Sequence, residues 1–191
     1  MLSTRLLLDL GSVEKAYHAI QPVRAKYDTY ADVSFTYGLI LYMQEKYADA
    51  LTEARRAYEL NPKYRDAHLL ELVIFRKAGR IEEFARKRGQ VDEVDPGEVA
   101  EKCFYHGLRF FEQAQYASSI YYFDAASVVG AEKWDCQFNI ACAYAKMQWI
   151  TDAHEMFKNI LSYEEKFKQH IIDDPDLEGY RSTEYFAALN L

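Results

Sequence analysis

The stretch 45-EKYADALTEARRAYELNP-62 decides the fold of this 191-residue chain. Small and apolar side chains recur there at three- and four-residue steps, as the buried face of an amphipathic helix requires. Beginning 34 residues later, 79-GRIEEFARKRGQVDEVDP-96 has a similar plan and also ends in proline. A period of 34 residues made of two amphipathic helices is typical of a helical repeat array.

The repeat frame extends in both directions from these two stretches. It predicts units over residues 31–64, 65–98, 100–133 and 134–167, preceded by a partial unit over 1–30. Gly38 and Ala50 are expected where two helices approach closely. The first helix of the partial unit spans only about 2–10, so the chain begins inside a repeat, either as a shortened terminal unit or as a piece of a larger protein.

The frame also predicts local irregularities. Leu72 and Phe84 stand where the first full unit has Gly38 and Ala50, so less regular packing is expected in 65–98. One extra residue precedes the unit at 100–133, and the Pro96–Gly97 dipeptide is the expected turn that holds it. Pro22 is expected to kink the second helix of the partial unit.

One spacing of residues recurs in the second helix of several units. It appears as Tyr47-x-x-Ala50-x-x-x-Ala54-x-x-Ala57, as Tyr116-x-x-Ser119-x-x-x-Phe123-x-x-Ala126 and as Ile150-x-x-Ala153-x-x-x-Phe157-x-x-Ile160. Over about residues 1–167 the chain therefore resembles the tetratricopeptide repeat (TPR) family. The resemblance implies an all-α, right-handed superhelix of antiparallel helix pairs with about four and a half repeats. It also implies a concave face lined by first helices and a C-terminal capping segment over 168–191.

Composition narrows the class of protein. A net charge of −7 disfavours nucleic acid as a partner, and an apolar content of 50% argues against disorder. Cys103, Cys136 and Cys142 show no CxxC spacing, so a reducing compartment without disulfides is expected. No signal peptide and no apolar run of about 18 residues is seen, so we expect a cytoplasmic protein without direct membrane insertion.

The sequence offers no constellation typical of catalysis. The five histidines form neither an HxxxH nor an HExxH pair, and no GxSxG motif or phosphate-binding glycine loop is present. We therefore expect no enzyme activity, no catalytic residue, no metal and no cofactor. A basic cluster lies within residues 76–88 and indicates either a solvated face or a site for an acidic partner. Its members are Arg76, Lys77, Arg80, Arg86, Lys87 and Arg88.

Helical phase places a second set of apolar residues on the first helices, away from the stripe that packs within each pair. By the geometry that the resemblance implies, these side chains line a concave groove that binds a peptide or an amphipathic helix. The expected groove residues are Phe35, Leu39, Tyr42, Leu69, Val73, Phe104, Leu108, Phe111, Phe138 and Cys142.

One acidic residue stands near the start of each first helix: Asp32, Asp66, Glu101 and Asp135. An acid in the first turn favours the helix dipole, and four acids in register also predict an acidic rim beside the groove. The two interpretations are compatible.

Together these features predict a scaffold or adaptor that binds another protein through an apolar or basic amphipathic segment. Two alternatives remain open: a self-assembling structural protein that forms homo-oligomers, and a chaperone for secreted substrates. The resemblance does not extend to the cationic clamp with which some TPR domains bind acidic chaperone tails. The matching groove positions carry Phe35, Leu39, Leu70, Glu101 and Tyr105 instead of cations.

Overall fold

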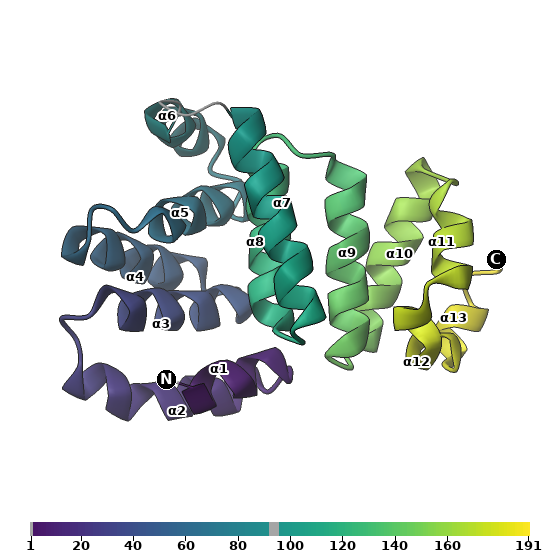
Figure 1. The fold of residues 1–191 in the computed structure, drawn as a ribbon, viewed down its shortest axis with the longest axis horizontal. Coiled ribbons are helices and arrows are strands. Elements are labelled where there is room, and N and C mark those ends of the chain that lie inside the picture. Colours follow the sequence, from purple (N-terminus) through teal and green to yellow (C-terminus); the bar gives the residue numbers. More distant parts are fainter. Residues whose placement is uncertain (1, 92–95) are drawn as a thin grey trace. The chain divides into compact units, whose positions relative to one another are not determined.

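The computed structural model describes residues 2–91 and 96–191, and every regular element in them is a helix (Figure 1). This confirms the prediction of an all-α fold for the described residues. The chain divides into two compact units, Met1–Ala100 and Glu101–Leu191. Each unit is described by itself.

The first unit contains three helix pairs. They are α1 (Leu2–Asp9) with α2 (Val13–Lys26), α3 (Ala31–Met43) with α4 (Tyr47–Leu60), and α5 (Arg65–Lys77) with α6 (Ile81–Val91). Each helix packs on the next one along the chain, and α5 also touches α3 (Figure 1). The junction at 92–95, which ends the predicted unit 65–98, lies outside the described residues.

The second unit begins within α7 (Pro96–Glu112), most of which belongs to it. It continues with α8 (Tyr116–Val129), α9 (Lys133–Lys146) and α10 (Ile150–Tyr163). Shorter helices follow: α11 (Phe167–Asp173), the 3₁₀ helix η1 (Pro175–Leu177), α12 (Glu178–Arg181) and α13 (Glu184–Ala187). In Figure 1 this last group lies beside α9 and α10, in agreement with their contacts.

A left-handed residue joins the two helices of each pair. These residues are Gly11, Glu45, Gly79, Ala114 and Gln148, with φ angles of 72°, 58°, 69°, 56° and 62°. Successive members are 34, 34, 35 and 34 residues apart, so the turn repeats in the predicted register, including its single extra residue. Only two of the five are glycine. The other three adopt a conformation that costs an ordinary residue roughly 1–2 kcal/mol.

The same hydrogen bond closes each of these turns. The residue after the left-handed one donates its backbone N–H to the carbonyl five residues earlier, as in a Schellman motif. The bonds are Ser12 to Leu7, Lys46 to Leu41, Arg80 to Phe75, Gln115 to Phe110 and Trp149 to Tyr144, all at 2.8–2.9 Å. The second helix then starts two residues after the left-handed position, at Val13, Tyr47, Ile81, Tyr116 and Ile150. Because α1 ends in this motif, it is the first helix of a pair.

Small residues allow the helices of a pair to approach closely. A Cβ atom added to Gly38 would lie 3.3 Å from the Cβ of Glu53 and 3.4 Å from the carbonyl oxygen of Ala50. One added to Gly107 would lie only 2.7 Å from the ring of Phe123. The expectation that Gly38 and Ala50 mark a close approach is confirmed.

Two local expectations need correction or refinement. Pro96 and Gly97 do not form a turn, because they are the first two residues of α7. Proline suits that place, since the first N–H groups of a helix have no intrahelical partner. Pro22 lies inside α2, which continues past it to Lys26, and the expected kink stays a prediction.

The residues after α10 pack back on the last helix pair. Phe167, Ile171, Leu177 and Tyr180 are buried in one apolar cluster with residues of α9 and α10. The side chain of Lys146 in α9 pairs with Asp176 at 2.7 Å. The hydroxyl of Thr183 accepts the backbone N–H of Phe186, which caps α13.

The left-handed turns make a first prediction. Replacing Ala114 with glycine is expected to stabilise the protein by about 0.5–1 kcal/mol, since relief of the strain exceeds the entropy that glycine adds to the unfolded chain. Urea unfolding measures the change. The matched control is Ala85→Gly at an exposed position inside α6, which is expected to destabilise by about the same amount. Equal effects of the two substitutions would contradict the role assigned to the turn.

The close approach makes a second prediction. Ala50 has no exposed surface, so Ala50→Asp places a carboxylate where it has no solvent. The expected cost is several kcal/mol, comparable with the roughly 5–15 kcal/mol that stabilises a whole domain. Circular dichroism during thermal unfolding is the measurement. A melting temperature equal to that of the unsubstituted chain would rule out this packing.

Candidate protein-binding surface

The predicted groove residues of the first unit are not exposed. Phe35, Leu39 and Tyr42 on α3 are 5–6% exposed, Leu69 on α5 is 7% exposed and Val73 has no exposed surface. All residues of α3 from Val33 to Tyr42 are in fact buried, so this helix has no open face there. The expectation that these five side chains form an accessible apolar patch is not met in this structure.

The sequence holds a signal for this burial. No charged residue occurs between Asp32 and Glu45, so α3 lacks the polar face of a surface helix. A helix that is apolar on every side is a buried helix. Within the first unit, Phe35 packs edge-on against Tyr64, with ring centroids 5.2 Å apart. The α3 part of the predicted groove therefore stays a prediction, without an exposed apolar face on α3 from Val33 to Tyr42 in this structure.

The groove residues of α9 are also covered. Phe138 is 9% exposed and Cys142 is 3% exposed. The ring of Phe138 stacks on Phe167 of α11, with centroids 5.3 Å apart, and both side chains share a core with Leu177. The residues after α10 thus occupy the face of α9 that was expected to meet a partner.

Helix α7 differs, because it keeps apolar side chains at its surface. Leu108 is 38% exposed and Tyr105 is 64% exposed, while Phe104 and Phe111 are half-buried. Their spacing of one, three and three residues places them along one side of the helix. Phe104 packs on Phe123 and Phe111 on Tyr116, each with ring centroids 5.3 Å apart, so α8 holds both rings in place. We call Phe104, Tyr105, Leu108 and Phe111 the α7 stripe.

The positions of the acidic residues in the predicted rim are partly explained by where the helices begin. Asp32, Asp66 and Asp135 lie in the first turns of α3, α5 and α9. Glu101 does not, because α7 begins earlier, at Pro96, and its first-turn acid is Glu98. The helix-dipole explanation therefore fails for Glu101, which is exposed beside the α7 stripe.

Two of the rim acids act on the same group. Burial raises the pKa of Tyr64 to about 12, with further upward contributions from Asp66 and Asp32 and a downward one from Arg5. Asp32 and Asp66 therefore lie on the same side of the first unit. Arg5 of α1 supplies a cation to that region.

Two members of the basic cluster form ion pairs with acids within the first unit. Arg80 pairs with Glu83. Lys87 pairs with the buried carboxylate of Glu71 at 2.6 Å, and Arg55 bonds the other oxygen of Glu71 at 2.8 Å. Arg76, Lys77, Arg86 and Arg88 are exposed. The cluster thus combines a buried ion pair with a solvated surface.

The histidines and cysteines show no arrangement for metal chemistry. In the described residues, no group of three or more histidine, cysteine or acidic side chains is placed to hold a metal ion. Each histidine instead lies against an aromatic ring. Burial, together with Asp124 and other nearby acids, raises the pKa of Cys136 to about 12, so its thiol is not a nucleophile near neutral pH.

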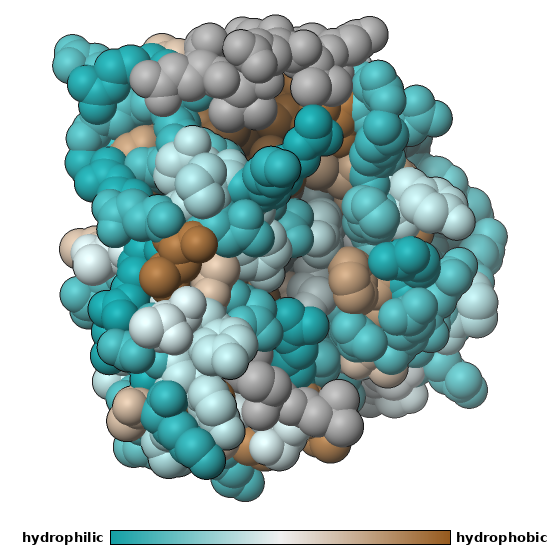
Figure 2. Space-filling view, turned by 60° about the vertical axis from the view of Figure 1, so that its left-hand side comes forward, coloured by the Kyte–Doolittle hydropathy of each residue, from teal (hydrophilic) through white to brown (hydrophobic). Residues whose placement is uncertain are grey.

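Figure 2 shows one face of the molecule, on which hydrophilic side chains predominate and hydrophobic ones form small separate areas. This distribution agrees with the burial of most predicted groove residues. In residues 2–91 and 96–191, no helix is both long and apolar enough to cross a membrane.

Comparison with known proteins supports the fold. A scan against protein-family models gave no match, and a search of curated proteins gave none either. A solved structure described as "MamA RS-1 ArsTM double mutant" is similar, with a TM-score of 0.50 and 16% sequence identity. The match covers 85% of this chain and 91% of that chain. At this identity the likeness concerns the fold alone, which is a TPR-like, all-α helical repeat.

The buried ion pair makes a third prediction, concerning pH. Burial raises the pKa of Glu71, but hydrogen bonds and charges from Lys87 and Arg55 outweigh it, so the pKa is lowered. A depressed carboxyl pKa stabilises the fold above the unfolded value of about 4.5, and this contribution is lost as pH falls through the folded value. We expect Glu71→Gln to cost about 2–3 kcal/mol at pH 7 and to flatten the loss of stability below pH 4.5.

His68 lies beside this ion pair and makes the stability of the fold depend on pH in a second range. Burial and then Lys87 lower its pKa, so the folded state resists protonation and stability declines as pH falls below about 6.5. Urea unfolding between pH 8 and pH 3 measures both ranges. His68→Gln is expected to remove only the loss of stability that comes from protonation of His68. An unchanged pH profile in both variants would contradict this account.

Proposed function

We propose that this chain is a protein-binding scaffold that uses the α7 stripe to capture an amphipathic helix or an extended peptide of its partner. One observation carries the proposal: Tyr105 and Leu108 are exposed on a first helix while the neighbouring rings of Phe104 and Phe111 are fixed by α8. Of the ten groove residues expected from the sequence, only the three on α7 retain exposed or half-exposed side chains.

The stripe has the composition of a binding surface. Tyrosine is enriched where interfaces bury a large side chain at low entropic cost, and a leucine beside it supplies an aliphatic contact. Phe104 and Phe111 are held by ring contacts before a partner arrives, so little ordering is needed on binding. Two to four apolar anchors at roughly 1.5–3 kcal/mol each favour a transient complex over a permanent one.

Charges around the stripe indicate the chemistry of the partner. Glu101 and Glu112 are exposed on the same side of α7, near the two ends of the stripe. A partner helix or peptide with an apolar centre and basic flanks complements this arrangement. Arg109 lies over the ring of Phe110, with its guanidinium carbon 5.5 Å from the ring centroid, so part of its charge is engaged by that ring.

The fourth prediction tests the stripe directly. A photo-crosslinking phenylalanine analogue placed at Tyr105 is expected to give discrete crosslinks to one or a few proteins in a native lysate. The same analogue at Tyr30, which is 56% exposed in the first unit, serves as the control and is expected to give none of these products. Identical products from both positions would contradict a specific surface on α7.

A matched pair of substitutions then measures the contribution of the stripe. Leu108→Asp is expected to reduce the yield of these crosslinks at least about tenfold, because it places a charge in the apolar contact. Ile81→Asp changes an aliphatic residue that is 57% exposed on α6 and is expected to leave the yield unchanged. Circular dichroism of both variants checks that they remain helical. Retention of the full yield in Leu108→Asp would place the binding surface elsewhere.

A further inference from the structure

The outer side of α1 carries two strongly exposed leucines. Leu6 is 60% exposed and Leu10, just beyond the helix end, is 63% exposed. They are four residues apart, so their side chains lie one above the other on adjacent turns. The opposite side of the helix is packed, since Thr4 and Leu8 are buried. A single exposed leucine is ordinary, but two on one helix face form an apolar patch without a partner in the described chain.

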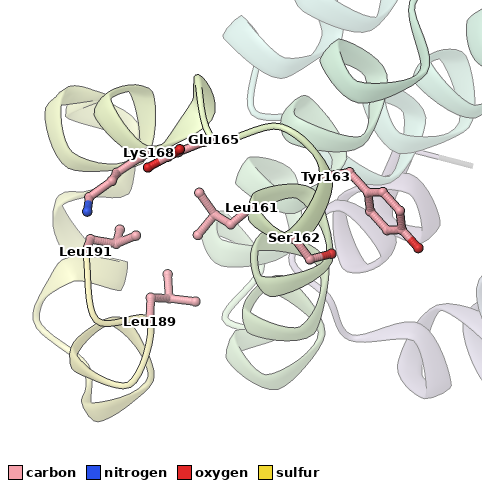
Figure 3. A pocket seen from close by; sticks show the side chains of 7 residues that line it. All are labelled: Leu161, Ser162, Tyr163, Glu165, Lys168, Leu189 and Leu191. Carbon is pink, nitrogen blue, oxygen red and sulfur yellow. The ribbon is translucent and has the colours of Figure 1, made fainter.

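The second unit contains a hollow in which three leucines form an apolar part of a lining that is otherwise polar. Its volume is about 360 Å³, and it lies between the end of α10 and the last residues of the chain (Figure 3). Leu161 points into it from α10, and Leu189 and Leu191 point toward Leu161 from the opposite side (Figure 3). All three leucines are only half-buried. The lining is completed by Ser162, Tyr163, Glu165 and Lys168.

We propose that the α1 patch of one copy of this chain docks in the α10 hollow of a second copy. A hollow of this volume accepts an aliphatic side chain, and its three leucines would contact Leu6 or Leu10 while its polar residues stay at the edge of the contact. Charge also agrees. Arg5, exposed next to Leu6, meets the carboxylate of Glu165 at the edge of the hollow. Lys168 also lines the hollow, and the methylene stem of its side chain adds apolar surface there.

The two surfaces are different, so the contact is heterologous. Docking at one pair of surfaces leaves one α1 patch and one α10 hollow of the two copies unused. These either pair with each other in a closed dimer or bind further copies in a ring or an open filament. A two-fold contact between two α1 helices would instead bring both Arg5 side chains to one interface and leave the hollow empty. This self-association is independent of the α7 stripe and of the function proposed for it.

Sedimentation velocity of the whole chain over about a hundredfold concentration range tests the proposal. We expect the average mass to rise above that of the monomer as the concentration increases. The double variant Leu6→Asp, Leu10→Asp removes the patch, and Ser162→Arg fills the edge of the hollow. The three altered residues are exposed, so the fold is expected to persist. Each variant is expected to raise the dissociation constant at least about tenfold. Ile81→Asp is the matched control and is expected to assemble like the unsubstituted chain.

Mixing the two variants gives the decisive result. The patch variant retains an intact hollow, and the Ser162→Arg variant retains an intact patch. An equimolar mixture is therefore expected to form a one-to-one dimer and nothing larger, although each variant alone is monomeric. A chain that stays monomeric at every concentration would overturn the proposal. So would a dimer that persists in the Ser162→Arg variant, since that outcome indicates a contact that does not use the hollow.

Discussion

The structure depends on one recurring constraint, the left-handed residue that ends the first helix of each pair. A positive φ angle at one backbone position lets the chain leave a right-handed helix and reverse within three residues. The hydrogen bond across the turn then satisfies a carbonyl at the helix end and fixes where the second helix starts. Because this happens at Gly11, Glu45, Gly79, Ala114 and Gln148, the pairs share one internal geometry. That geometry persists although Glu45, Ala114 and Gln148 are not the residues that the conformation favours.

The same turn brings the two helices into close contact and so controls the core. Gly38 admits Ala50 and Glu53 from α4, and Gly107 admits the ring of Phe123 from α8. Charged groups enter this core only with partners: Glu71 has Lys87 and Arg55, and Glu53 bonds Arg24 of α2 at 2.5 Å. Replacing one member of such a pair leaves the charge of the other uncompensated and destabilises the fold. The residues at these positions therefore depend on each other.

The helix packing decides which apolar side chains stay exposed, and these form the candidate binding surfaces. A first helix is buried when its sequence lacks a polar face, as in α3. It is also buried when another segment covers it, as α11 covers α9. Helix α7 retains charged residues on one side, and Tyr105 and Leu108 are exposed among them. The α1 patch and the α10 hollow are open in a different way, because each exposes leucine side chains and has no covering segment in the described chain. The partner surface and the self-association surface are therefore distinct.

The sequence by itself determined the helices, their pairing and their register, because a helix period and small residues at fixed positions are local properties that one chain displays directly. It did not determine which faces stay exposed. Phe35, Phe104 and Phe138 occupy equivalent places in the repeat, yet the first and last are buried and Phe104 is half-exposed. Only tertiary structure decides such cases, since exposure depends on segments distant in sequence, such as Tyr64 against Phe35 and Phe167 against Phe138.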